Sequence, residues 1–177
     1  HQHEGEPSQE PVTALAVPLS SADEELESAL ADWLLAAEKP KLLHDVKDAG
    51  KRLAWRGLPL RGAVEDTLIS GYLVQPDRRN FAFDDLVTQH LSGSTEPSDY
   101  IGGERFAGSR EEPVQGSLFD AAREPVPGVT EEDLARAGVR GMLLHSLSSR
   151  LHAELVERKA EQLFYEMEIP LAEILLQ

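Results

Sequence analysis

The carboxylate best placed for chemistry stands where a predicted strand meets a predicted helix. Asp66 ends the segment RGAVED and is followed at once by Thr67 and the helical pattern TLISGYLV. A carboxylate at such a junction invites a catalytic interpretation, because hard divalent cations prefer anionic oxygen ligands. The same position is the usual place of an N-cap, whose side chain accepts backbone N–H bonds at the start of a helix. We expect Asp66 to be this cap, and Glu65 to be its neighbour at the strand end.

Other side chains with metal-binding or nucleophilic potential offer little. His1 and His3 stand in the first residues of the chain, while His145 and His152 are seven residues apart on one helical pattern. They have no ligand partner at the i+3 or i+4 spacing of a helical metal pair, so we expect surface histidines. The chain has no cysteine, which excludes a disulfide framework, a thiolate zinc site and a cysteine nucleophile.

Strands and helices alternate in the first half of the chain. The run PVTALAVPL (11–19) lies between prolines, is too short for a helix and predicts a buried strand. PKLLHD (40–45) and RGAVED (61–66) predict two further short strands, the second leading into a helix that starts at Asp66. This alternation predicts a layered α/β domain.

The helices of this half carry start and stop signals. Ser21 and Glu24 have capping-box spacing at the start of the first helix. Its apolar residues recur on one face, namely Leu26, Leu30, Trp33, Leu34 and Ala37. Gly57 is expected to end the next helix, DVKDAGKRLAWRG. Trp55 in that helix is expected, like Trp33, to lie in the core.

The second half begins with a segment of different composition. Residues 95–129 are rich in Gly, Pro, Ser and charge and predict a flexible acidic insert. It separates the α/β part, 1–94, from C-terminal helices over 130–177. Thr130 and Asp133 have capping spacing at the start of these helices, and Pro170 is expected to bend or restart them. The expected core face is Leu144, Leu147, Leu151, Leu155, Phe164, Met167, Leu171, Ile174 and Leu175.

Composition restricts the partners. The chain has 177 residues, and 17 Lys and Arg against 32 Asp and Glu give a net charge of −15. Such a surface should repel DNA, since binding to phosphate backbones needs clustered positive charge. No apolar run approaches the length of a membrane helix, so we expect no membrane partner. The absence of cysteine fits a reducing compartment, and we expect a cytoplasmic location.

Several segments together resemble a known family. The segment KLLHDVKDAGKRLAWRGLPLRGAVEDTLISGYLVQP, the later FDDLVTQHL and the C-terminal FYEMEIPLAEIL are similar to parts of the 3′–5′ exonuclease domain of bacterial DNA polymerase I, particularly its actinobacterial branch. The resemblance implies a ribonuclease H-like α/β fold, with a sheet flanked by helices and a long C-terminal helical segment that leads toward a polymerase domain. It also implies a place in DNA replication and repair.

Active members of that family cleave a DNA 3′ end with two metal ions held by carboxylates. The resemblance places Ala49 at one metal-binding aspartate, and Arg136 and Arg140 at the tyrosine and aspartate of a late helix. An Asp-x-Glu pair on the family's first strand has no counterpart in residues 1–20. Alanine binds no metal and arginine repels one, so we expect no catalytic residues, no metal and no cofactor here.

A short motif in the insert resembles a docking peptide. QGSLF (115–119) is similar to the Gln-x-x-Leu-Phe peptide by which bacterial polymerases bind the sliding clamp. Leu118 and Phe119 would supply two apolar anchors, and Gln115 would fix the register by hydrogen bonds. Alternatively, Leu118 and Phe119 fold back onto this domain as a loop anchor, because an exposed apolar pair is a liability.

We therefore expect an inactive exonuclease-like domain with a structural role in a DNA polymerase I. Its partner would be the rest of the polymerase chain, and DNA would be bound through the whole enzyme. One alternative is an active nuclease whose site is rebuilt from Asp48, Asp66 and upstream carboxylates. The other is an interaction module whose main task is to present residues 115–119 to the sliding clamp.

Overall fold

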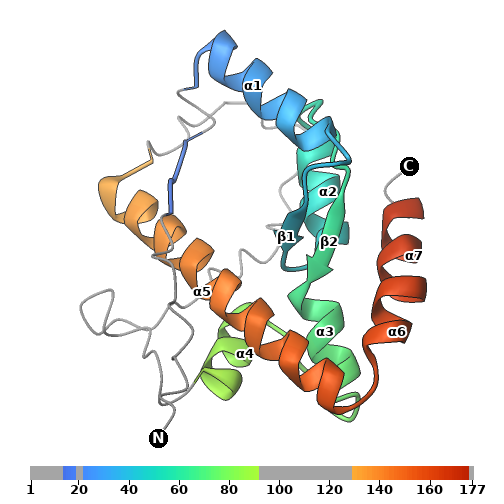
Figure 1. Cartoon of the computed structure of the whole chain (residues 1–177). Coiled ribbons are helices and arrows are strands. Elements are labelled where there is room, and N and C mark those ends of the chain that lie inside the picture. The colour runs from blue at the N-terminus through green and yellow to red at the C-terminus, as the bar shows by residue number, and fades with distance from the viewer. Residues whose placement is uncertain (1–13, 19–21, 92–128, 176–177) are drawn as a thin grey trace, which may run out of the picture.

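The computed structural model of the chain describes residues 14–18, 22–91 and 129–175. In these ranges helices predominate around a small parallel sheet (Figure 1). The elements are α1 (Glu24–Leu35), β1 (Lys41–Leu43), α2 (Val46–Ala54), β2 (Ala63–Asp66), α3 (Thr67–Val74), α4 (Phe83–His90), α5 (Glu131–Glu157), α6 (Glu161–Leu163), the π-helical turn η2 (Phe164–Glu168) and α7 (Ile169–Ile174).

The two strands and the helix between them form a parallel β-α-β unit. β1 pairs with β2 with Leu42 opposite Glu65 and Leu43 opposite Asp66. The predicted strands at 40–45 and 61–66 and the helices that follow them are confirmed. Gly57 has a φ of 75° in the turn after α2, as expected of a residue that ends a helix.

The first predicted strand is wrong. Residues 14–18 belong to no strand, and Leu15 is 87% exposed. No described strand lies beside them, and an unpaired strand would leave its backbone N–H and C=O groups without partners. This segment runs instead beside α5, because a Cβ built on Gly138 would stand 3.8 Å from the Cβ of Ala14.

Two expectations for the first helices are also corrected. The N-cap of α1 is Asp23, whose side chain accepts from the N–H of Leu26 at 2.9 Å, in place of the predicted Ser21, which lies outside the described residues. Trp33 is exposed and carries the Lys41 ammonium 5.1 Å from its ring centroid, while Trp55 is 95% exposed. Trp55 follows the last residue of α2, and its side chain does not lie on the buried face of that helix, which contains Val46 and Gly50.

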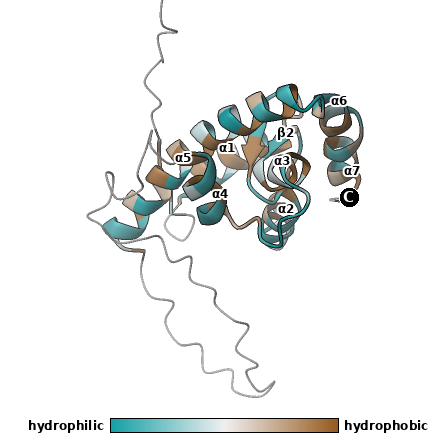
Figure 2. Ribbon diagram, turned by 90° about the horizontal axis from the view of Figure 1, so that it is seen from below, coloured by the Kyte–Doolittle hydropathy of each residue, from teal (hydrophilic) through white to brown (hydrophobic). Residues whose placement is uncertain are grey.

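The core consists of two clusters of buried residues. A large cluster joins α3, α4 and α5 to Phe164, and a smaller one joins α1, α2 and β2 to Ala172 of α7. α5 crosses α3 and α4, while α7 runs beside β2 (Figure 1) and η2 packs against α3. Figure 2 shows hydrophobic and hydrophilic residues alternating along α5, as one buried face of a helix requires.

The capping box of α5 is confirmed, because Thr130 and Asp133 bond reciprocally at its start. Leu147, Leu151 and Leu155 of α5 are buried as predicted. The fourth buried leucine is Leu143, where the sequence predicted Leu144. Leu144 is partly buried against the same cluster.

The C-terminal core face beyond Phe164 is wrong. Met167, Leu171, Ile174 and Leu175 are exposed, whereas Ile169 and Ala172 are buried. The π-helical turn, in which the N–H of Ile169 bonds the carbonyl of Phe164, adds a residue to one turn and so rotates the following face. Pro170 stands in the first turn of α7, where it restarts the helix as predicted. None of the described helices is long and apolar enough to cross a membrane.

Candidate functional site at the strand ends

Asp66 is the centre of the candidate site. Its carboxylate is buried, with the residue 1% exposed, and accepts three backbone N–H bonds. Oδ1 accepts from Asp45 at 3.0 Å and from Leu68 at 2.9 Å, and Oδ2 accepts from Val46 at 2.8 Å. The predicted N-cap of α3 is confirmed, and the same side chain also holds the start of α2. Both carboxylate oxygens are therefore engaged by the protein backbone.

His44 fills the space beside this carboxylate. Its Nδ1 lies 2.9 Å from the hydroxyl of Thr67, and its ring meets Phe83 edge to face with centroids 5.4 Å apart. Burial lowers the pKa of His44, although the nearby carboxylates of Asp66 and Asp45 act to raise it. The neutral imidazole is thus favoured between α2, α3 and α4.

Arg140 of α5 lies near His44 and contacts two residues of α4. Its Nη1 lies 2.9 Å from Oδ1 of Asp84, and its guanidinium carbon stands 4.4 Å from the centroid of Phe83. An ion pair stacked on an aromatic ring holds the cation in a fixed position. The structure therefore brings Arg140 together with Phe83 and His44 through contacts that no sequence spacing indicates.

The other two sequence-predicted positions lie apart from this arrangement. Ala49 is half-buried in α2, and Arg136 stands one turn before Arg140 and bonds Glu132. The clamp-like residues Gln115, Leu118 and Phe119 lie outside the described residues, as does all of the predicted insert except Val129.

A two-ion metal centre needs several free carboxylates, and the described residues do not fit one. Both oxygens of Asp66 already accept backbone N–H bonds, Ala49 offers no ligand, and Arg140 contributes a positive charge. Across the described ranges no group of three His, Asp or Glu side chains is placed to hold a metal ion.

A second polar cluster was not predicted from the sequence. The hydroxyl of Tyr165 in η2 donates to Glu65 of β2 and lies 3.0 Å from Nδ1 of His152 in α5. Burial raises the pKa of Glu65, and burial together with the Glu65 carboxylate raises that of Tyr165. His145 and His152 are exposed, as predicted. Glu65 was expected only to neighbour Asp66, and no short spacing could have linked it to residues so distant in the chain.

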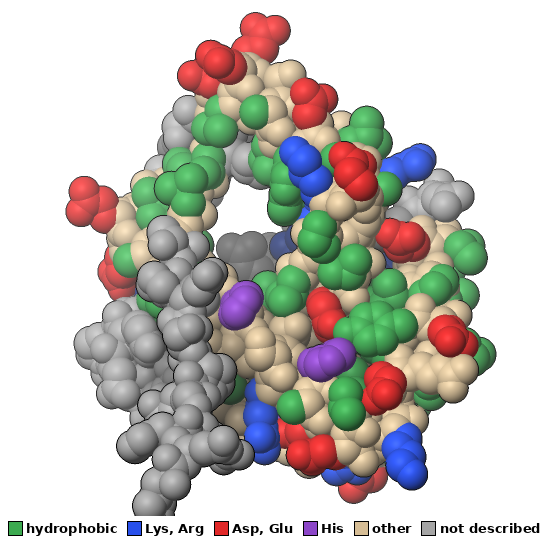
Figure 3. Space-filling model, viewed as in Figure 1, with side chains coloured by type: hydrophobic (Ala, Val, Ile, Leu, Met, Phe, Trp, Pro, Cys, Tyr) green, Lys and Arg blue, Asp and Glu red, His purple; other side chains and the backbone are tan. Residues whose placement is uncertain are grey.

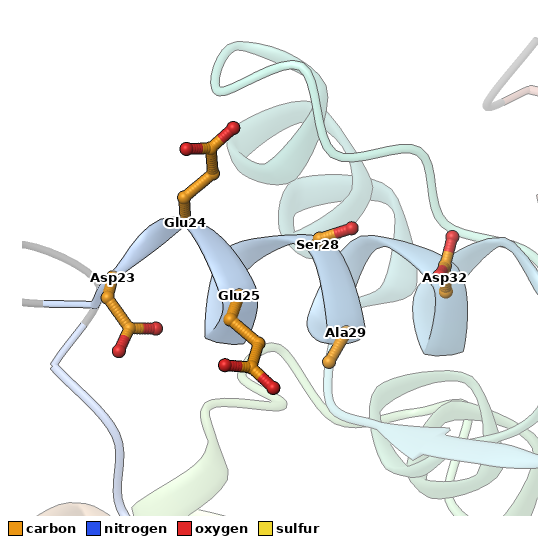
Figure 4. Close-up of a pocket in the computed structure, with 6 residues that line it drawn as sticks. All are labelled: Asp23, Glu24, Glu25, Ser28, Ala29 and Asp32. Carbon is orange, nitrogen blue, oxygen red and sulfur yellow. The ribbon is translucent and has the colours of Figure 1, made fainter.

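Two surface hollows lie among the described residues. One lies along α1 and is lined by acidic and small residues: Asp23, Glu24, Glu25, Ser28, Ala29 and Asp32. Figure 4 shows the Glu24 and Glu25 side chains pointing in different directions, so they form no cage for a cation. The other hollow lies where α2 meets α7 and is lined by Ala37, Gly50, Ala54, Pro59, Leu60, Arg61 and Glu173.

The parallel strand pair and the helices around it form an α/β arrangement that many families share, and a match in sequence identifies it as a ribonuclease H-like domain. Residues 14–101 match the family model described as "DNA polymerase I, ribonuclease H-like domain". Over these residues the chain belongs to the family of exonuclease-like domains of DNA polymerase I.

Relatives at the sequence level carry the same name. The chain is 32% identical over 149 residues to DNA polymerase I of Mycobacterium leprae, covering 84% of this chain and 15% of the relative. It is 32% identical over 146 residues to DNA polymerase I of Bacillus subtilis, covering 81% of this chain and 14% of the relative. The chain thus spans only a small part of these polymerases.

A solved structure agrees with this assignment. The POL domain of Pol1 from M. smegmatis, in complex with a DNA primer-template and dNTP, matches with a TM-score of 0.63 and 28% sequence identity. The match covers 88% of this chain and 21% of that chain.

Proposed function

We propose that this chain is an inactive 3′–5′ exonuclease-like domain with a structural role in a DNA polymerase I. The observation that supports this most directly is Arg140, which the family resemblance places at a metal-binding aspartate and which is held by Asp84 and Phe83. An arginine supplies no anionic oxygen for a divalent ion, and its positive charge disfavours such an ion at that position.

The rebuilt-site alternative would require free carboxylates at the strand ends. Asp48 is instead paired with Arg52 at 2.6 Å, and Asp66 is buried by its three backbone donors. Recruiting Asp66 to a metal would break its three backbone hydrogen bonds, which cap α3 and hold the start of α2. An inactive domain requires no such rearrangement.

A digestion assay tests the proposal. The chain is incubated with a 5′-labelled single-stranded DNA in Mg²⁺ and, separately, in Mn²⁺, beside a DNA polymerase I that carries the complete carboxylate set. We expect no shortening of the DNA by this chain under conditions in which the control digests it, and no heat of Mn²⁺ binding by calorimetry.

Shortening of the DNA that disappears in an Asp48→Asn variant would overturn the proposal in favour of the rebuilt site. Asp48 is exposed, so this substitution should leave the fold intact and separate chemistry from stability.

On this proposal, the whole polymerase binds DNA and acts in replication and repair, and this chain is one structural part of it. The sliding-clamp peptide at residues 115–119 stays a prediction. If it acts, a Leu118→Ala, Phe119→Ala double variant should lose clamp binding without a change in melting temperature.

A further inference from the structure

The surface around α2 is basic in a chain that is acidic as a whole. Residues 39–61 contain seven of the 17 Lys and Arg of the chain but only two of its 32 Asp and Glu. Elsewhere acidic side chains predominate, and Figure 3 shows them scattered over the face in view, from α1 at the top to the lower edge. α2 and the turn after it therefore form a local positive region.

The exposed residues of α2 follow a regular spacing. Lys47, Lys51 and Trp55 are exposed and stand four residues apart, which places them on one helical face. Trp55 keeps helical backbone angles, with φ −62° and ψ −22°, so it extends this row, which we call the basic ridge. Within the described ranges neither lysine belongs to an ion pair. Like charges four residues apart destabilise a helix, so these two charges do not serve the fold.

Trp55 is the end of the ridge and is 95% exposed. A single exposed apolar residue is common on a protein surface. Tryptophan and arginine are nevertheless enriched among the residues that dominate binding at protein interfaces, and Arg56, next in the chain, is also exposed. A tryptophan beside unpaired cations therefore suits an acidic partner that also carries an apolar side chain.

A small hollow adjoins the ridge where α2 meets α7. Its lining includes Ala54, which stands one helical turn from Lys51, together with Pro59, Leu60 and the cation Arg61. The volume of about 270 Å³ lies below the roughly 300–1,000 Å³ of pockets for drug-sized ligands. The hollow therefore suits an apolar side chain of a larger partner better than a free small molecule.

We propose that the basic ridge and the adjoining hollow bind an acidic segment of a separate protein. Its carboxylates lie on Lys47 and Lys51, and an apolar side chain lies between Trp55 and the hollow. Such a segment is complementary in charge to this surface. Charges beyond the screening length of about 8 Å at physiological salt act on it only weakly, so the acidic remainder of the molecule does not exclude a short peptide.

The same observations disfavour the other occupants. A DNA duplex makes several phosphate contacts at once and would reach the acidic surfaces around the ridge. Single strands are bound in basic grooves with aromatic platforms, whereas the ridge is a convex helix face with one aromatic ring. A second copy would bring a further net charge of −15.

A peptide titration tests the proposal. The probe is a short fluorescein-labelled peptide in which a Leu-Phe pair is flanked on both sides by Asp and Glu, and its anisotropy is followed as the chain is added. Lys51→Glu and Arg158→Glu change the net charge equally, but Arg158 is an exposed residue at the end of α5. We expect Lys51→Glu and Trp55→Ala each to weaken binding at least about tenfold, and Arg158→Glu less than about twofold.

Two further readouts locate the bound peptide. A control peptide with Ser-Ser in place of Leu-Phe should bind at least about tenfold more weakly, because it has no apolar anchor. Trp33→Phe leaves Trp55 as the only tryptophan of the chain. In this variant the acidic peptide should shift the tryptophan emission to shorter wavelength and reduce its quenching by acrylamide.

Several outcomes would overturn the inference. They are the absence of saturable peptide binding, equal binding of the two peptides, and equal weakening by Lys51→Glu and Arg158→Glu. Tighter binding of a labelled single-stranded oligonucleotide than of the acidic peptide would identify a nucleic-acid surface instead. Protection of Trp55 from acrylamide in the chain alone would identify a second copy if it grows with concentration, and a segment of the same chain if it does not.

Discussion

At the scale of single residues, Asp66 shows how a position suited to catalysis serves the fold. Its carboxylate satisfies N–H groups at the starts of two helices, α2 and α3. Buried donors left without an acceptor each cost free energy, so a replacement at this position should act on stability.

We expect Asp66→Ala to lower the free energy of unfolding by about 3 kcal/mol, because three buried backbone donors lose their acceptor. Urea denaturation followed by circular dichroism measures this loss. The matched control is Asp48→Ala, which removes an exposed carboxylate of α2 and should cost about 0.5 kcal/mol or less. Equal effects of the two substitutions would contradict the capping role.

At the scale of elements, the loop before β2 is held against the end of α1 by close backbone contact. The N–H of Arg61 bonds the carbonyl of Leu34 at 2.9 Å, and the N–H of Lys41 bonds that of Gly62 at 2.9 Å. Gly62 has a φ of 72°, and a Cβ there would lie 2.5 Å from the carbonyl oxygen of Ala37. This position therefore requires glycine for both its conformation and its space.

Gly62→Ala should reduce the free energy of unfolding by about 3 kcal/mol, the sum of a left-handed backbone penalty and a backbone clash. Gly57→Ala is the matched control, since its φ is 75° and nothing lies within 4 Å of its added Cβ. It should cost only about 1 kcal/mol. Thermal and urea unfolding of both variants measures the difference, and an equally mild effect at Gly62 would show that the loop moves away.

At the scale of the whole molecule, the net charge of −15 decides how the chain meets nucleic acid. Its basic side chains are in part neutralised within the domain, for example Arg140 by Asp84 and Arg150 by Glu154. Attraction to phosphates needs an excess of positive charge along one surface.

We expect the chain alone to bind a fluorescently labelled primer-template with a Kd weaker than roughly 100 µM at physiological salt, beyond ordinary non-specific binding. Fluorescence anisotropy is the measurement. The M. smegmatis polymerase, whose structure contains a DNA primer-template, is the positive control. Saturable binding that weakens steeply with salt would contradict this expectation and point to a basic surface on this domain.

Local signals in the sequence were sufficient for much of the first half and for the start of α5. The β-α-β unit, the Asp66 cap, the Thr130 and Asp133 capping box and the turn at Gly57 were all predicted correctly. These features depend on residues within a few positions of one another, because caps, glycine turns and hydrophobic periods are short-range properties of the chain.

Other features were decided by contacts between distant segments. Residues 14–18 have strand composition but no described strand beside them, and the apolar residues Leu163, Met167, Leu171 and Ile174 are exposed despite their core composition. The meeting of Arg140 with Asp84 and of Tyr165 with Glu65 likewise joins separate elements. An apolar pattern indicates that a face favours burial, whereas only the packing of the other elements determines which face meets the core and which stays exposed.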